Sequence, residues 1–199
     1  MTLLQEIGRK LIHLSSLWMV VFIHMFEKET SILFFGALFV LFFICEYLRM
    51  TQPFVISLTN RYFKNIMRAH ESVTRFDLRA LTGSFYFVLP VFLSIALFEK
   101  DVAIAAILIM IVSDTLAAII GKRFGRIHIW DKTLEGSLTF FATTCIILVS
   151  LPMYLTYWQI LVIAFLVSIV ELVSNKVAIT NDNLTITLSA GLLISLLGF

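Results

Sequence analysis

The chain has 199 residues, of which 60% are hydrophobic and only 14% are charged. A water-soluble domain of this size exposes much of its surface and needs far more polar residues to cover it, so the composition excludes an ordinary soluble protein. The formal net charge is only +2, and we expect no nucleic-acid partner.

Seven apolar stretches, each about as long as a bilayer's hydrocarbon core, predict an all-α, polytopic membrane helix bundle. The predicted spans cover residues 11–26, 32–48, 83–98, 102–120, 138–155, 158–173 and 184–197. No small-residue cleavage site follows the first apolar run, so we expect this run to be retained as a helix rather than removed as a signal peptide. Residues 1–199 are interpreted as a single integral membrane domain.

The connections between these spans differ sharply in their basic residues. The N-terminus and the connections at 49–82, 121–137 and 174–183 hold 13 of the 15 lysines and arginines, and only Lys28 and Lys100 lie on the other side. Basic connections stay in the cytoplasm, so the N-terminus is predicted inside and the C-terminus outside. The membrane itself is interpreted as a cell inner membrane or an ER-type membrane.

The connection after the second span is long and patterned. Phe54, Leu58, Tyr62 and Ile66 recur at four-residue spacing, which predicts an amphipathic helix over 53–80 lying in the inner interface. This helix is interpreted as an anchor against anionic lipid or as a lid or guide for a lipid substrate. The cysteines of the chain, Cys45 and Cys145, lie in apolar stretches and are interpreted as packing residues.

Ionisable residues inside predicted spans are costly in a bilayer and tend to mark function. Glu46, Asp114 and Glu171 all lie toward the predicted cytoplasmic ends of their spans. The first and last spans begin on that same side, with Arg9 and Lys10, and with Asp182 and Asn183, respectively. Asp114 lies about two helical turns inside the end marked by Gly121, and its carboxylate needs a cation or a metal as partner. A purely structural pair with Arg9, Lys10 or Lys122 is the alternative.

A glycine-containing basic connection, Gly121-Lys-Arg-Phe-Gly125-Arg126, follows the fourth span, and Asp131-Lys132-Thr133-Leu-Glu135-Gly136-Ser137 opens the fifth. Glycines let backbone amides approach an anion, and the neighbouring cations suit a polyphosphate. This connection is not a Walker A loop, because its ending and the preceding strand are absent. Magnesium prefers carboxylate oxygens together with substrate phosphates, and Asp114, Glu135, Glu171 and Asp182 could supply the carboxylates. A simple topology signal is the alternative interpretation of the basic residues.

At these residues the chain resembles the CTP-dependent lipid-alcohol kinases, the family of dolichol kinase, phytol kinase and the fungal CTP-dependent diacylglycerol kinase. The matching segments are Arg9-Lys10-Leu-Ile-His13, Thr82-Gly83-Ser-Phe-Tyr86, Ser113-Asp114-Thr-Leu-Ala-Ala-Ile-Ile-Gly121-Lys-Arg-Phe-Gly125, Lys132-Thr-Leu-Glu135-Gly136-Ser137, Glu171, and Asn181-Asp182-Asn183-Leu-Thr185. The resemblance implies transfer of the γ-phosphoryl group of CTP to the hydroxyl of a membrane lipid alcohol, with Mg²⁺ as cofactor, on the cytoplasmic side.

The resemblance also implies roles for individual residues. It implies a catalytic set of Asp114, Glu135, Glu171, Arg9 and Lys10, with Glu135 or Glu171 orienting the metal or accepting the alcohol proton. It implies metal binding by Asp114, Asp182 and Glu135. It implies nucleotide or phosphate contacts by Gly121, Lys122, Arg123, Gly125, Lys132, Thr133, Gly136, Ser137 and Asn183. His13, Glu46 and Tyr86 are assigned to the lipid substrate. For His13, phosphate binding and a role as a packed, hydrogen-bonded histidine are the alternatives.

One motif keeps a second activity open. Ser113-Asp114-Thr115 also resembles phosphatidate cytidylyltransferase, which uses CTP and magnesium but forms a CDP-lipid. The chain lacks the Gly-His-Gly-Gly…Asp-Arg ending of that enzyme, which favours the kinase. A non-enzymatic transporter or membrane scaffold is the third hypothesis, although a transporter would place its charged residues nearer the bilayer midplane. The sequence leaves open which alcohol (polyprenol, phytol-like or diacylglycerol) is the acceptor, and whether the protein is a homodimer.

Overall fold

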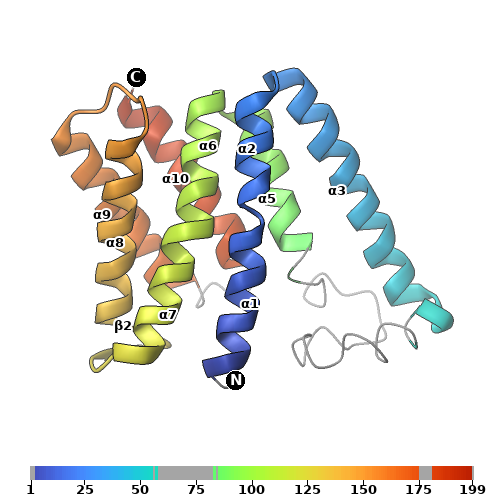
Figure 1. Cartoon of the computed structure of the whole chain (residues 1–199), viewed down its shortest axis with the longest axis horizontal. Helices are drawn as coiled ribbons and strands as arrows, with labels where there is room; N and C mark the ends of the chain where they lie inside the picture. Colours follow the sequence, from blue (N-terminus) through green and yellow to red (C-terminus); the bar gives the residue numbers. More distant parts are fainter. Residues whose placement is uncertain (1–2, 56, 58–82, 84, 175–180, 199) are drawn as a thin grey trace.

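The computed structural model describes residues 3–55, 57, 83, 85–174 and 181–198, and these form a bundle that is almost entirely helical (Figure 1). The helices are α1 (Leu3–Ser15), α2 (Leu17–Met25), α3 (Lys28–Thr51), α5 (Phe85–Leu97), α6 (Lys100–Leu108), α7 (Asp114–Phe124), α8 (Leu134–Ser150), α9 (Tyr157–Ser174) and α10 (Asp182–Gly198). A π-helical turn at Ile109–Ser113 joins α6 to α7. Two short antiparallel strands, β1 (His128–Ile129) and β2 (Lys132–Thr133), form a hairpin before α8.

The helical prediction is confirmed, and every predicted span overlaps an apolar helix. Within the described residues, three helices are long and apolar enough to cross a membrane, namely Lys28–Thr51, Lys100–Phe124 and Tyr157–Ser174. The shorter apolar helices are Lys10–Met25, Phe85–Leu97, Leu134–Ser150 and Asp182–Gly198. The predicted amphipathic helix over 53–80 falls almost entirely outside the described residues.

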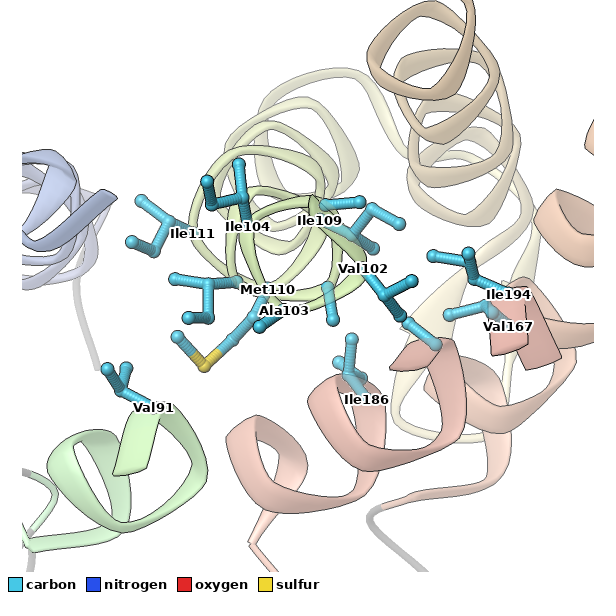
Figure 2. Packing of buried hydrophobic residues seen from close by; sticks show 14 of the residues in the cluster. Val91, Val102, Ala103, Ile104, Ile109, Met110, Ile111, Val167, Ile186 and Ile194 are labelled. Carbon is cyan, nitrogen blue, oxygen red and sulfur yellow. The ribbon is translucent and has the colours of Figure 1, made fainter. Parts of the chain in front are cut away.

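The helix Lys100–Phe124 forms the centre of the bundle. Its apolar window is 67% buried inside the protein, whereas that of α3 is only 17% buried. Small side chains such as Ala103 and Ala106 let neighbouring helices approach its axis closely. Figure 2 shows isoleucines of α10 and Val91 of α5 among the residues packed around this central helix. The central helix therefore carries Asp114 inside the protein rather than on its surface.

Several chain segments meet at one end of the bundle. Figure 1 shows the start of α1, the end of α7, the hairpin, and the start of α8 at the lower end, where α9 finishes and α10 begins. The C-terminus and the α2–α3 connection lie at the opposite end. We call the lower end the hairpin end. Nearly all of the candidate site residues belong to segments that reach it.

The first predicted span, 11–26, departs from the structure at Ser16. The helix begins earlier than predicted, at Leu3, and is interrupted between α1 and α2. The Ser15 hydroxyl donates to the Ile12 carbonyl at 2.7 Å, and the Ser16 amide turns back to the His13 carbonyl at 3.1 Å. Serine side chains compete in this way with the regular helical hydrogen bonds, which explains the break.

The fifth predicted span, 138–155, is also shifted. Helix α8 begins at Leu134 because the Thr133 hydroxyl accepts a hydrogen bond from the Gly136 amide at 3.2 Å and so caps its first turn. It ends at Ser150, two residues before Pro152, because the residue preceding a proline disfavours the helical conformation. The apolar residues that follow are not helical.

Candidate functional site

Two lysine–carboxylate pairs, one buried and one part-buried, join distant segments at the hairpin end. Lys10 of α1 forms an ion pair with the Oδ2 atom of Asp114 at the start of α7, and its Nζ atom lies 3.4 Å from the Asp114 carbonyl oxygen. Lys132 of β2 forms an ion pair with Glu171 of α9, with Nζ 2.5 Å from Oε1, and also donates to the Glu171 carbonyl. An unpaired charge removed from water is costly, so charges in such places are usually paired with an opposite charge or bound to a metal.

The two ion pairs and the charged residues near them lie close enough together to form one cluster. Asp114 is also near enough to His13 and Lys132 for electrostatic attraction, and Glu171 is near enough to Asp114 and Asp182 for their like charges to repel. The Ser137 hydroxyl lies 3.5 Å from Oε2 of Glu171. We call the set the charged cluster; it comprises Lys10, His13, Asp114, Lys132, Glu171 and Asp182. Residues up to 172 positions apart in the sequence thus meet at one place.

The π-helical turn lies directly before Asp114. The Ser113 hydroxyl, which is fully buried, accepts a hydrogen bond from the Thr144 hydroxyl of α8 at 3.2 Å. The Thr115 hydroxyl is also buried and has no hydrogen-bond partner among the described residues. Single π turns inside α-helices occur often at functional sites, because they break the regular pattern of helical hydrogen bonds. The turn therefore marks the surroundings of Asp114 as a candidate site on grounds independent of charge.

Glycines let α7 pack closely against α8 beside this site. A Cβ atom on Gly121 would lie 2.7 Å from the Thr133 hydroxyl and 3.4 Å from the Cα atom of Gly136. A Cβ atom on Gly136 would lie 3.0 Å from the Ala117 carbonyl oxygen, and one on Gly125 would overlap the Thr133 side chain. The structure thus gives these glycines a packing role. Their predicted contact with phosphate, like that of Thr133, remains a prediction.

The carboxylate of Glu135 faces the loop before the hairpin. Its Oε1 atom accepts hydrogen bonds from the Arg126 amide at 2.9 Å and the Ile127 amide at 3.3 Å, and its Oε2 atom lies 3.4 Å from the Ile127 amide. Its own backbone amide, followed by that of Arg126, holds the pKa of the Glu135 carboxyl below its usual value. Glu135 is therefore ionised at neutral pH and already bonded to the loop.

An open cavity of about 480 Å³ lies beside this loop. Its lining residues are Arg123, Phe124, Gly125, Arg126 and Glu135. The guanidinium of Arg123 lies 5.3 Å from the centre of the Phe124 ring. Guanidinium groups bind phosphate oxygens in a fixed fork geometry, so the cavity suits an anionic ligand. Arg126 is one of the cations that the sequence analysis grouped near a polyphosphate, although it was not assigned individually as a phosphate ligand.

The residues assigned to a lipid substrate lie on three different helices. Glu46 forms a buried pair with Arg49 on α3, with Nη2 2.8 Å from Oε2. His13 of α1 packs edge-on against Phe87, with ring centres 4.5 Å apart, and Tyr86 of α5 packs against Phe85. Arg49 was not a predicted site residue, although its spacing of three from Glu46 on a helix could have indicated the pair.

The other predicted residues lie around the same end. Lys122 and Arg123 are exposed at the end of α7, and Arg9 lies in α1 with a side chain outside the described structure. Asn181 directly precedes α10, and its side-chain oxygen accepts a hydrogen bond from the Asn183 amide at 3.1 Å. The predicted phosphate contact of Asn183 remains a prediction.

The predicted metal ligands do not form a three-ligand cage. Among the described residues there is no group of three or more histidine, cysteine, aspartate or glutamate side chains that could hold a metal ion. Glu135 is engaged with loop amides, whereas Asp182 and Asp114 both interact with Glu171. Mg²⁺ is commonly held by only one or two carboxylates together with substrate phosphates. Binding of Mg²⁺ by one or two carboxylates of the charged cluster remains a prediction.

Sequence comparison identifies relatives of the chain. It is 34% identical over 191 residues to the uncharacterized protein RP860 of Rickettsia prowazekii, covering 92% of this chain and 90% of the relative. It is 30% identical over 169 residues to the uncharacterized protein MJ1137 of Methanocaldococcus jannaschii, covering 79% and 85%. The chain belongs to the same family as these two proteins. No family model matches it, and no solved structure matches it.

A partial similarity connects the chain to an enzyme. The CTP-dependent diacylglycerol kinase 1 of Saccharomyces cerevisiae is 29% identical to it over 106 residues. The alignment covers 52% of this chain and 34% of the kinase. The similarity indicates a kinase-like membrane protein and extends over about half of the chain.

Proposed function

We propose that this protein transfers the γ-phosphoryl group of CTP to the hydroxyl of a membrane lipid alcohol at the cytoplasmic face of the membrane. Two independent lines of support converge on this function. One is the partial similarity to a CTP-dependent diacylglycerol kinase. The other is the charged cluster, which collects lysines and carboxylates at one end of an apolar bundle, where a lipid head group and a soluble nucleotide can meet.

The observation that carries the proposal is the presence of two ion pairs, the buried Lys10–Asp114 pair and the part-buried Lys132–Glu171 pair. Phosphoryl transfer requires little covalent chemistry from a protein and depends mainly on positioning and charge neutralisation. Each lysine is held in place by a carboxylate and can instead neutralise phosphate oxygens when a nucleotide binds. Each carboxylate is then released to bind a cation or accept a proton.

Residues of the charged cluster have different roles in the proposed reaction. Lys10 and Lys132 neutralise the phosphates, and Glu171 accepts the proton that leaves the alcohol hydroxyl as its oxygen attacks the γ-phosphorus and the bond to the β-phosphate oxygen breaks. The cavity beside Arg123 and Arg126 receives the remainder of the nucleotide. Asp114 and Asp182 would hold Mg²⁺ together with the phosphates. When bound, the ion would supply additional neutralisation of the triphosphate charge.

The test is a product assay with the full chain in lipid nanodiscs, γ-³²P-labelled CTP, Mg²⁺ and a panel of polyprenol, phytol and diacylglycerol. Label is expected in a lipid phosphate formed from one class of alcohol. Asp114→Asn is expected to lower kcat at least about 100-fold, because it removes the cluster's central charge. The matched control is Asp101→Asn, which removes an exposed carboxylate from the other end of the same helix and should keep near-wild-type activity. Equal activity of the two variants would contradict the proposal.

A specific observation keeps a cytidylyltransferase as the second candidate. The buried Ser113-Asp114-Thr115 segment, with its unbonded Thr115 hydroxyl, matches the motif shared with phosphatidate cytidylyltransferase. That enzyme would form a CDP-lipid from phosphatidate and release pyrophosphate. Incubation with phosphatidate and CTP labelled at the α-phosphorus distinguishes the two reactions, because only the cytidylyltransferase places that label in lipid.

A further inference from the structure

We propose that Glu135 is a positioning residue, which fixes the hairpin that carries Lys132, and that it is not a metal ligand. The inference rests on the proposed function insofar as it assigns Lys132 to the nucleotide phosphates. It differs from the role that the sequence motif suggests, in which Glu135 binds or orients the metal. Its evidence is the direction in which the Glu135 carboxylate points.

The hairpin is short and has little stability of its own. Its strands pair His128 with Thr133 and Ile129 with Lys132, and one further bond joins the Leu134 amide to the Ile127 carbonyl at 2.9 Å. An isolated two-stranded hairpin is marginally stable at best in water. Something outside the strands must therefore hold the hairpin in one place.

Glu135 supplies that restraint at the open end of the hairpin. Its carboxylate accepts from the backbone amides of Arg126 and Ile127, directly beyond the Leu134–Ile127 bond. The carboxylate thereby continues the hydrogen bonding between the two arms after the strands have ended. Hydrogen bonds to an ionised acceptor are about twice as strong as those between neutral groups. Because Glu135 belongs to the first turn of α8, it ties the loop to a rigid helix.

The position of Lys132 depends on this restraint. Lys132 lies in β2, three residues before Glu135, and its ammonium group reaches Glu171 on α9. Arg126 donates a hydrogen bond from its backbone amide to Glu135 and also lines the cavity. Loss of the carboxylate therefore loosens both a cluster lysine and a cavity arginine. A nucleotide would then bind more weakly, whereas the chemistry of the bound complex would change much less.

This role predicts a pattern of effects that a metal ligand would not produce. Glu135→Ala is expected to raise the KM for CTP about tenfold and to change kcat less than about threefold. Glu135→Gln is expected to recover most of that loss, because its side-chain oxygen still accepts from the Arg126 amide. The Mg²⁺ concentration for half-maximal activity should stay the same in both variants. A metal ligand would instead show a large loss with glutamine and a shifted Mg²⁺ requirement.

The experiment compares wild-type protein, Glu135→Ala, Glu135→Gln and the control Asp131→Asn, which removes an exposed carboxylate from the same hairpin. Hydrogen–deuterium exchange is measured for the peptide spanning residues 124–134 in nanodiscs, alongside the CTP and Mg²⁺ kinetics. We expect faster exchange in the alanine variant, near-wild-type exchange in the glutamine variant, and no change in the control.

Two results would overturn the inference: unchanged exchange in Glu135→Ala, or an equal kcat loss and shifted Mg²⁺ requirement in Glu135→Gln. If the wild-type protein phosphorylates no lipid alcohol, the proposed function fails by itself. The exchange measurement then still decides whether Glu135 positions the hairpin, so the two failures are distinguishable.

Discussion

Replacing Lys10 with methionine tests whether the cluster's central ion pair holds the bundle together. The substitution leaves the Asp114 carboxylate without its lysine at a position where the two side chains are only 6% and 11% exposed. Removing one partner of a buried pair costs about 3–5 kcal/mol, because the remaining charge keeps its desolvation penalty. Asp114→Asn is expected to cost a similar amount, since it leaves Lys10 buried without a carboxylate. The double variant should lose about 2–3 kcal/mol less than the sum of the single variants.

The assay is SDS-induced unfolding in mixed micelles, followed by tryptophan fluorescence for the wild type, both single variants and the double variant. Lys100→Met is the control, because the Lys100 ammonium bonds to the exposed carbonyls of His24 and Phe26 and forms no part of the cluster. Its expected cost is about 1 kcal/mol or less. Single-variant losses that simply add in the double variant, to within about 0.5 kcal/mol, would refute the coupling of Lys10 to Asp114.

Three further substitutions test the local packing, each through the same unfolding measurement. Gly136→Ala is expected to destabilise the protein by about 1–3 kcal/mol, because the added methyl group would press on the Ala117 carbonyl; an unchanged midpoint would contradict the close contact of α7 and α8. Thr133→Val should cost about 1 kcal/mol by removing the cap of α8, and a stability equal to wild type would show that the cap contributes little. Trp130→Gly should stabilise the hairpin by about 1 kcal/mol, because Trp130 has φ of 58° in the left-handed region; a destabilised variant would mean that the side chain contributes more than the strain costs.

The positions of the helices could largely be predicted from the sequence, because bilayer-length apolar stretches leave few alternatives to helix. The central location of Lys100–Phe124 was harder to predict from the sequence. Helix α3 is almost as apolar and yet lies largely exposed. The break at Ser16 was missed for a local reason. Whether serine hydroxyls bond to the preceding turn depends on side-chain conformations that hydrophobicity does not report.

The sequence could predict at which end of the bundle the candidate site lies, but not which residues pair with one another there. The alternation of spans predicted that Lys10, Asp114 and Glu171 would share one membrane depth, and the structure pairs Lys10 with Asp114 and places Glu171 near Asp114. The partner of Asp114 was open among several nearby cations, because choosing Lys10 requires the packing of α1 against α7. The pairing of Glu171 with Lys132 was equally unpredictable, because it depends on the position of the hairpin that carries Lys132.

The direction of the Glu135 side chain could not be predicted. It depends on the turn of the hairpin, and that turn places Trp130 in a conformation that usually favours glycine, so no turn signal was present in the sequence. The motif around Glu135 indicated chemistry with phosphate or metal. The structure shows a carboxylate bonded to backbone amides.

The central claim is that the chain moves the γ-phosphoryl group of CTP to a lipid alcohol, and its most direct test is the fate of each phosphorus atom. Purified protein in nanodiscs is incubated with Mg²⁺, the alcohol panel and phosphatidate, in parallel reactions with CTP labelled at the α- or the γ-phosphorus. The account predicts γ-label in a lipid monophosphate, no α-label in lipid, and loss of the product in Asp114→Asn but not in Asp101→Asn. Lipid labelled only from the α-phosphorus, or no labelled lipid from either nucleotide, would contradict it.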